Sequence, residues 1–125
     1  MSDQTTFRLA EELMSSFGQR LVLDTMEIRE ILEGEEELVS RCLDFLVARD
    51  RLLIAAGRSP LFYHKDNVIK AIVAELGSGQ SMKAEELAGN LSLPIATTCE
   101  VLGWLERERR VVVEQVGEDV HFIGR

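Results

Sequence analysis

The sequence has little of several features that mark particular classes of protein. Its 125 residues include two cysteines, two prolines and one tryptophan, and its apolar runs, such as residues 52–56, are short. A membrane-spanning helix needs about 20 mostly apolar residues, so none is expected. The opening stretch, MSDQTTFRLAEE, lacks the basic and apolar segments of a signal peptide. We therefore expect a cytoplasmic protein that does not enter a membrane.

Positive charge is also scarce. The chain has 14 lysines and arginines against 22 acidic residues, a net charge of −8. Residues 1–65 carry 12 acidic and 8 basic side chains (−4), and residues 66–125 carry 10 and 6 (also −4), so neither half is a basic arm. This balance disfavours diffuse attraction to nucleic acid or to an anionic lipid surface.

The residues that are present predict a packed, helix-rich first half. Apolar residues make up 46% of the chain, and from Phe7 to Phe17 they recur at helical spacing, which predicts a helix over residues 5–20. Asp24 followed by Glu27 resembles a capping box and predicts a short helix that ends at Gly34. A further helix is expected over residues 35–51. Residues 52–55 and 61–64 flank a turn-rich stretch and predict a β-hairpin.

The second half repeats this plan. A helix is expected over residues 67–76, followed by Ser81 as the cap of a helix that ends near Gly89, with Asn90 in a left-handed conformation. Pro94 suits the first turn of the next helix. Residues 111–125, with a turn at Gly117, predict a second hairpin.

The run LAGNLSLPIATTCEVLGWLERERRV, followed by this hairpin, resembles the winged-helix superfamily. The two halves also align with each other, which predicts two tandem winged-helix units, residues 1–65 and 66–125, packed together with almost no linker. The expected class is therefore helix-rich α+β. The paired positions are Met26/Met82, Glu30/Glu86, Ile31/Leu87, Leu43/Leu102, Phe45/Trp104, Leu46/Leu105, Arg51/Arg110, Gly57/Gly117 and Phe62/Phe122.

Nothing in the sequence has the pattern of a catalytic, metal or cofactor site, so we predict no enzyme activity, no metal and no cofactor. His64 and His121 fit half-exposed strand positions, although shared zinc ligation is the alternative. The acidic run of residues 35–37 fits a solvated helix start, because consecutive helical residues point in different directions. The glycines in LGSGQS fit a turn better than a phosphate-binding loop. Cys42 and Cys99 are expected to be buried and unpaired, with a disulfide as the alternative.

The resemblance implies that the third helix of a unit can enter a DNA major groove. The first unit opens that helix with three glutamates, which repel phosphates. In the second unit Thr97 and Thr98 lie at the helix start, while the wing tip carries Glu118 and Asp119. The only basic cluster is Arg107, Arg109 and Arg110, which also fits an ordinary charged helix end. A transcriptional regulator that binds DNA through the second unit as a dimer is therefore the alternative function, and duplex DNA binding is not expected at physiological salt.

The leading hypothesis is a non-enzymatic protein-interaction module, a scaffold or regulatory subunit. Tandem winged helices are used in this way in the kleisin-binding proteins of bacterial condensins and in membrane-sorting complexes, and the acidity of this chain favours the comparison. Tyr63 and Trp104 are the candidate anchors for a protein partner, and a homodimer is one assembly that such a module permits. The alternative for both aromatic side chains is that they pack inside the protein.

Overall fold

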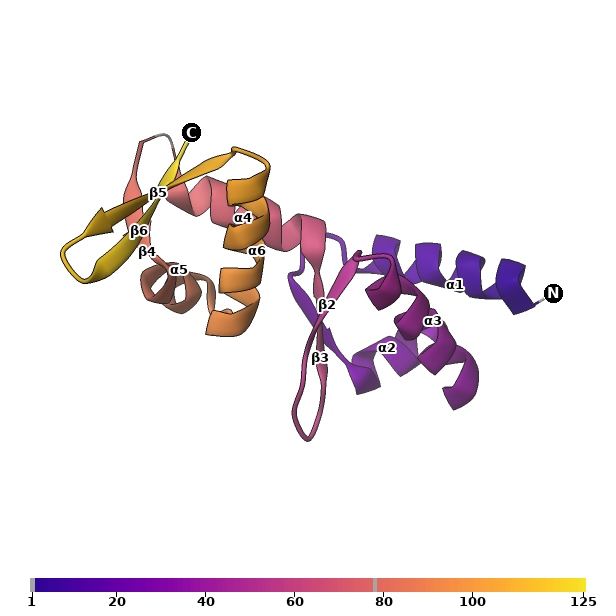
Figure 1. Cartoon of the computed structure of the whole chain (residues 1–125). Helices are drawn as coiled ribbons and strands as arrows, with labels where there is room; N and C mark the ends of the chain where they lie inside the picture. The colour runs from indigo at the N-terminus through magenta and orange to yellow at the C-terminus, as the bar shows by residue number, and fades with distance from the viewer. Residues whose placement is uncertain (1, 78) are drawn as a thin grey trace. The chain divides into compact units, whose positions relative to one another are not determined.

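The computed structural model describes residues 2–77 and 79–125. These residues form two compact units, one ending at Asn67 and the other running from Val68 to Arg125. The first unit contains α1 (Ser2–Ser16), β1 (Val22–Asp24), α2 (Thr25–Leu32), α3 (Glu36–Ala48), β2 (Leu52–Ala55) and β3 (Leu61–His64) (Figure 1). The following elements are α4 (Lys65–Leu76), β4 (Ser81–Lys83), α5 (Ala84–Leu91), α6 (Ile95–Arg107), β5 (Val111–Val116) and β6 (Asp119–Gly124).

Both units have the same topology. Each contains a three-stranded antiparallel sheet, with the order β1-β3-β2 in the first unit and β4-β6-β5 in the second. Helix, strand, helix, helix and hairpin is the order of a winged helix, so the predicted helix-rich α+β class is confirmed. The short strands β1 and β4 were not predicted. A strand of three residues is too short to show a period-two alternation.

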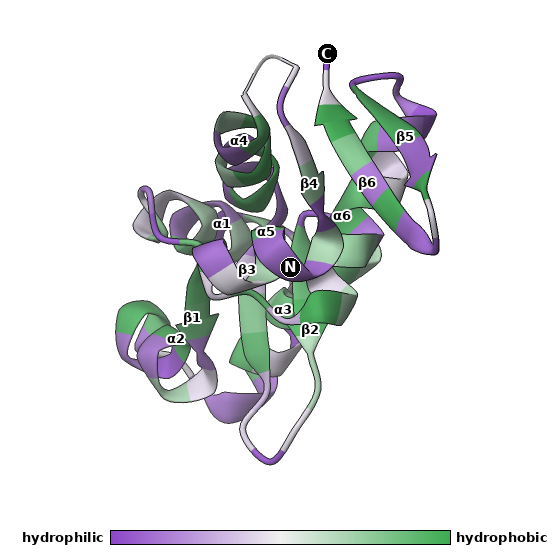
Figure 2. Ribbon diagram, turned by 90° about the vertical axis from the view of Figure 1, so that its left-hand side faces the viewer, coloured by the Kyte–Doolittle hydropathy of each residue, from purple (hydrophilic) through white to green (hydrophobic). Residues whose placement is uncertain are grey.

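Each unit has its own apolar core. In the first unit the buried side chains come from α1, α2, α3 and the inner face of the sheet, and include Leu13, Phe17, Leu23, Ile28 and Leu46. In the second unit the largest fully buried side chains are Val68, Ile72, Leu76, Leu87, Leu102 and Leu105. Along these ribbons hydrophobic and hydrophilic residues alternate (Figure 2), as expected for amphipathic helices that bury one side.

Equivalent positions in the two units lie 59 residues apart over most of their length. Both units place left-handed residues at such positions: Gly18 and Gly77, Glu33 and Ser92, Asp50 and Arg109. The predicted pairs Leu43/Leu102, Phe45/Trp104 and Arg51/Arg110 have this spacing. Three other predicted pairs are wrong by three positions: Met26/Met82, Glu30/Glu86 and Ile31/Leu87. Met26 is an exposed residue of α2, whereas Met82 is buried in β4, the strand that the sequence did not reveal.

The start of α2 confirms the predicted capping box. The Asp24 side chain accepts a hydrogen bond from the Glu27 amide at 2.8 Å, and Glu27 Oε1 accepts one from the Asp24 amide at 3.1 Å. At the equivalent start of α5 only the second half of this arrangement exists, from the Lys83 amide to Glu86 Oε1 at 3.0 Å. A lysine ammonium has no acceptor atom, so it cannot cap the helix.

Two predicted helix boundaries in the second unit are wrong. Ser81 lies in β4 rather than at a helix start, and α5 begins at Ala84. The helix also continues past Gly89 to Leu91, and Ser92, not Asn90, is the left-handed residue (φ 56°). The Asn90 side chain instead donates a hydrogen bond to the Glu75 carboxylate at 3.1 Å.

Replacing Glu27 by Gln should lower the stability of the first unit near pH 7. The hydrogen-bonded Arg20, whose Nη1 lies 2.7 Å from Glu27 Oε2, and the Asp24 amide lower the pKa of Glu27. A lowered pKa stabilises the fold above the unfolded value of about 4.3, and this contribution disappears as the pH falls through the lower folded value. Thermal unfolding between pH 7 and pH 3 should therefore show the two proteins converging in acid. Glu30→Gln removes one negative charge from an exposed position of the same helix, so it is the control for the loss of charge alone.

Candidate functional site at the wing of the second unit

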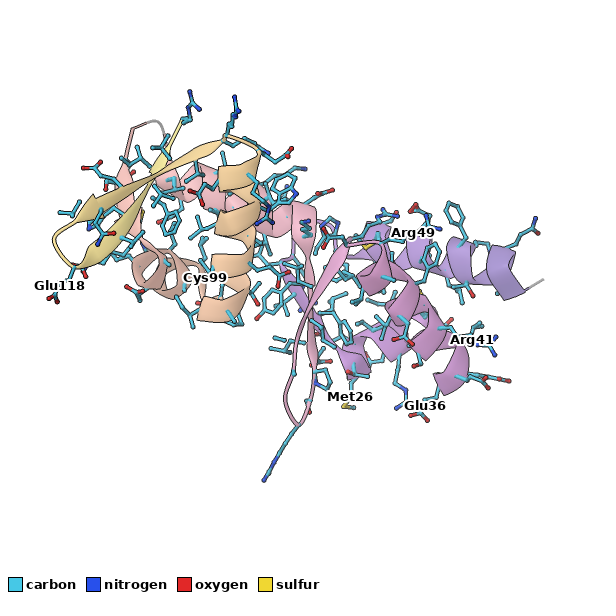
Figure 3. All side chains as sticks on the ribbon, in the orientation of Figure 1. Met26, Glu36, Arg41, Arg49, Cys99 and Glu118 are labelled. Atoms are coloured by element: carbon cyan, nitrogen blue, oxygen red, sulfur yellow. The ribbon has the colours of Figure 1, made fainter. Side chains whose placement is uncertain are left out.

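The most exposed part of the second unit is its hairpin, which we call the wing (residues 111–124). In Figure 1 its tip projects beyond α5, and Figure 3 labels Glu118 there. The strands pair from Val111 with Gly124 to Val116 with Asp119, which leaves a two-residue turn. Gly117 has φ 65° and Glu118 does not have a positive φ, as is typical of a type II′ turn with glycine first.

The wing carries valines on both faces. Val111 and Val113 lie on the face that also carries Met82 and Phe122, and near its base this face is part of the core. Val112 and Val116 lie on the opposite face. Four valines are more than a third exposed: Val112 (44%), Val113 (36%), Val116 (47%) and Val120 (41%). The hairpin therefore extends an apolar surface past the core that supports its base.

One edge of β5 has no strand partner among residues 2–77 and 79–125, because β6 occupies the other edge. The Arg125 amide donates to the Arg110 carbonyl at 3.3 Å, which fixes the hydrogen-bonding phase of the ladder. In this phase residues 112, 114 and 116 bond to β6. Val113 and Gln115 therefore direct their N–H and C=O groups outward from the free edge.

The wing is acidic. It contains Glu114, Glu118 and Asp119 and no lysine or arginine. Lys83 Nζ, on β4, lies 3.2 Å from Asp119 Oδ2, and this contact raises the pKa of Lys83. Glu114 and Glu118 form no ion pair in the described part of the chain. The free edge is therefore flanked by valines and uncompensated carboxylates.

The two predicted aromatic anchors differ in their exposure. Tyr63 is buried, at 3% exposure, and burial raises the pKa of its hydroxyl, so it does not project from the surface. Trp104 is half-buried on α6. His64 is half-buried as predicted, and its Nδ1 accepts a hydrogen bond from the Asn67 amide at 3.2 Å, which caps α4. His121 lies 3.0 Å from Ser81 Oγ.

The two threonines that would contact DNA under the alternative function lie inside the protein. Thr97 and Thr98 are 5% and 0% exposed, and Thr98 Oγ1 donates to the Pro94 carbonyl at 3.0 Å. Thr98 is on the buried stripe of α6 with Val101 and Leu105, at the position that Val39 has in the first unit. Side chains placed in this way cannot reach a base edge.

The three arginines of the basic cluster noted in the sequence are exposed, and two of them line the same pocket. Arg109 and Arg110, in the turn between α6 and β5, line a cavity of about 220 Å³ together with Arg125. Arg107 is exposed but does not line it. Arg125 was missed because it lies far from the other arginines in the sequence. Its pairing with Arg110 across the hairpin brings it there.

Three further predictions from the sequence concern metal ligands, membrane helices and the two cysteines. In the described residues no group of three or more His, Cys, Asp or Glu side chains is arranged to hold a metal ion. No helix in that part of the chain has the length and apolarity needed to cross a membrane. Both cysteines are free, but only Cys42 is buried, so the expected burial of Cys99 is wrong. Figure 3 labels Cys99 on α6, where it lies one residue beyond the buried stripe.

The two thiols should therefore react at very different rates in the native protein. Cys42 is 0% exposed, and burial raises its pKa to about 11, so it has little of the reactive thiolate at pH 8. With an aromatic disulfide reagent we expect one thiol to react rapidly and the second only after denaturant is added. Cys99→Ser should abolish the rapid phase. Equal rates for both thiols in the native protein would contradict the structure.

No protein-family model and no curated protein sequence matches the chain. Among solved structures it is similar to the mRNA-binding domain of elongation factor SelB from E. coli in complex with SECIS RNA (15% identity, 100% of this chain and 98% of that one, TM-score 0.48). It is also similar to a chain of the ESCRT-II endosomal trafficking complex (10% identity, 98% of this chain and 91% of that one, TM-score 0.47). A third similar structure is the DIP2311 protein from Corynebacterium diphtheriae (13% identity, 94% of this chain and 26% of that one, TM-score 0.44). At these identities and TM-scores, function is not carried over.

Proposed function

We propose that the chain is a non-enzymatic interaction module of two tandem winged-helix domains, residues 1–65 and 66–125, and that it binds an extended segment of a protein partner. The partner segment adds to the free edge of β5 as a further strand. The free edge of β5 supports this proposal, because its outward-directed amides lie between exposed valines on the two faces of the sheet.

Strand addition uses the groups that this edge presents. An added strand gains backbone hydrogen bonds, here to Val113 and Gln115, and its side chains gain contacts on the two faces of the sheet. Soluble proteins usually protect a long edge strand with charged side chains, above all lysine, with a proline or with a bulge. The six residues of β5, VVVEQV, contain neither lysine nor proline, and Glu114 is their one charged side chain. An edge left open in this way is typical of a surface that another chain covers.

The charge of the wing indicates the chemistry of the partner. Glu114 lies on one face of the wing and Val113 on the other, so an added strand that alternates β-branched and basic residues places its β-branched side chains beside Val113 and its cations beside Glu114. Such a segment brings its cations close to Glu114 and Glu118. A second copy of this chain is a poorer match, because each copy has a net charge of −8 and an acidic wing.

DNA reading remains the weaker candidate. Readers of duplex DNA commonly neutralise about 6–10 phosphates with cationic side chains. In the second unit the exposed arginines are at the C-terminal end of α6, whereas the wing tip carries carboxylates and Thr97 and Thr98 are buried. We therefore propose no transcriptional role.

Val113→Pro should abolish partner binding and leave the fold intact. Proline removes the amide hydrogen at a position where that amide faces away from β6, so the internal ladder is kept. Val112→Pro removes an amide that bonds to β6 and should destabilise the unit, whereas Val113→Thr keeps the amide and should bind. Binding is measured by calorimetry with a synthetic decapeptide of alternating isoleucine and lysine, and by quantitative mass spectrometry of proteins captured from the native host.

Amide hydrogen exchange provides the direct test of the contact. In the free protein the Val113 and Gln115 amides should exchange faster than those of Val112 and Glu114. When the peptide binds, hydrogen exchange at the Val113 and Gln115 amides should slow by about tenfold or more, because these amides then donate to the added strand. Binding without this protection, or undiminished binding by Val113→Pro, would refute strand addition. Concentration-dependent dimerisation that Val113→Pro abolishes would identify a second copy as the occupant instead.

A further inference from the structure

The base of the wing contains a cluster of cations that are not paired with an acidic side chain in the described part of the chain. Arg109, Arg110 and Arg125 all line the cavity of about 220 Å³, and none of them forms an ion pair in the described part of the chain. Six other cationic side chains do form such pairs: Arg20, Arg29, Arg41, Arg51, Lys65 and Lys83. In a chain with a net charge of −8, three unpaired guanidinium groups around one cavity call for a specific explanation.

The backbone holds these arginines in place. Arg109 has a left-handed conformation (φ 60°), and the Arg110 amide donates to the Leu105 carbonyl at 2.9 Å, which fixes the turn after α6. Arg125 Nη1 donates to the Arg109 carbonyl at 3.3 Å. The Arg125 guanidinium is therefore directed toward the other two arginines rather than extended freely into solvent.

The remaining walls define what kind of ligand fits. Val73, Leu76 and Val111 supply apolar surface, and no acidic side chain lines the cavity. Drug-sized ligands occupy pockets of about 300–1,000 Å³, so this cavity suits a smaller group. A compact oxyanion can accept paired N–H donors from guanidinium groups, and a short aliphatic stem can rest on the valines and leucine.

We propose that this pocket binds the phosphoryl group of a phosphomonoester in its dianionic form. Three cations match a dianion better than the single charge of a phosphodiester. The second pKa of a phosphomonoester is about 6, so the dianion predominates at neutral pH. An extended polyanion such as duplex DNA fits poorly, because Glu106 and Glu108 flank the arginines on the surface of α6 and the turn that follows it. This inference goes beyond the proposed strand addition and uses different residues.

The test is calorimetric titration of the full chain, tagged only at its N-terminus, with O-phosphoserine, a capped phosphoserine tripeptide, inorganic phosphate and random duplex DNA. We expect saturable 1:1 binding of the phosphomonoesters at pH 7.5, weakening as the pH is lowered through 6. Arg110→Gln and Arg125→Gln should each weaken binding by about tenfold or more, as loss of a charged hydrogen bond predicts. Arg107→Gln, which changes an exposed arginine in the last turn of α6 outside the pocket, should alter the affinity by less than about twofold.

The probes also separate the sources of the phosphoryl group. Equal binding of inorganic phosphate and O-phosphoserine supports a site for the phosphoryl group alone, and tighter binding of the tripeptide supports a phosphorylated protein. Near-ultraviolet circular dichroism checks that the variants fold. If a variant does not fold, shifts of the arginine Nε–H signals in NMR spectra of the wild-type protein report on the same contacts.

Other results would overturn the proposal. These are the absence of saturable binding at millimolar phosphomonoester, an equal loss on Arg107→Gln, or binding of duplex DNA alone. Val113→Pro alters the strand edge and not the pocket. Failure of phosphomonoester binding and failure of strand addition can therefore be told apart.

Discussion

The pairing of β6 with both of its neighbours is the constraint on which the second unit depends. Because β6 is the central strand, its register with β4 and β5 decides which residues enter the core and which face outward. The same register directs the Val113 and Gln115 amides away from the sheet and brings Arg125 to Arg110. A slip of one residue would exchange the two faces and separate the arginines. The free edge and the basic pocket thus follow from a single set of backbone hydrogen bonds.

The two units share a topology but present different surfaces. In the first unit β2 and β3 have four residues each and are joined by residues 56–60, whereas β5 and β6 have six residues each and are joined by a two-residue turn, so the paired strands are longer in the second hairpin. The exposed Phe7 of the first unit stacks edge-on against Phe45, with ring centroids 6.4 Å apart, and Arg49 lies 4.7 Å from the centre of the Phe45 ring. These aromatic rings have partners within their own unit. The valines of the second wing are exposed on both faces.

The features predicted correctly from the sequence have local causes. The Asp24–Glu27 capping box, the amphipathic helices and the turn at Gly117 each depend on residues a few positions apart. The misses depend on distant pairing. β4 exists because it pairs with β6, so the three residues around Met82 gave no signal of their own. Cys99 was placed in the core because it is surrounded by apolar neighbours, although the buried stripe of α6 runs through Thr98 and Val101 on either side of it.

The candidate site was predictable only in part for the same reason. Arg109 and Arg110 stood out as a basic cluster, but their association with Arg125 requires the hairpin register. Thr97 and Thr98 were considered as base-contacting residues because the winged-helix resemblance places them at the start of the third helix of the second unit. Their burial follows from the rotation of α6, which the larger residues Leu102 and Leu105 determine by their own burial.

The close approach of Gly124 to Gly77 has a consequence for how this surface can change over evolutionary time. A Cβ atom at Gly124 would lie 2.1 Å from the Gly77 carbonyl oxygen, so a side chain there requires the backbone to move. Glycine at this position is demanded by packing whether or not the neighbouring cavity is used. The arginines around it carry no such steric requirement. In divergent descendants of this chain, an invariant glycine would therefore report only on the fold, and retention of all three arginines would report on selection for the ligand.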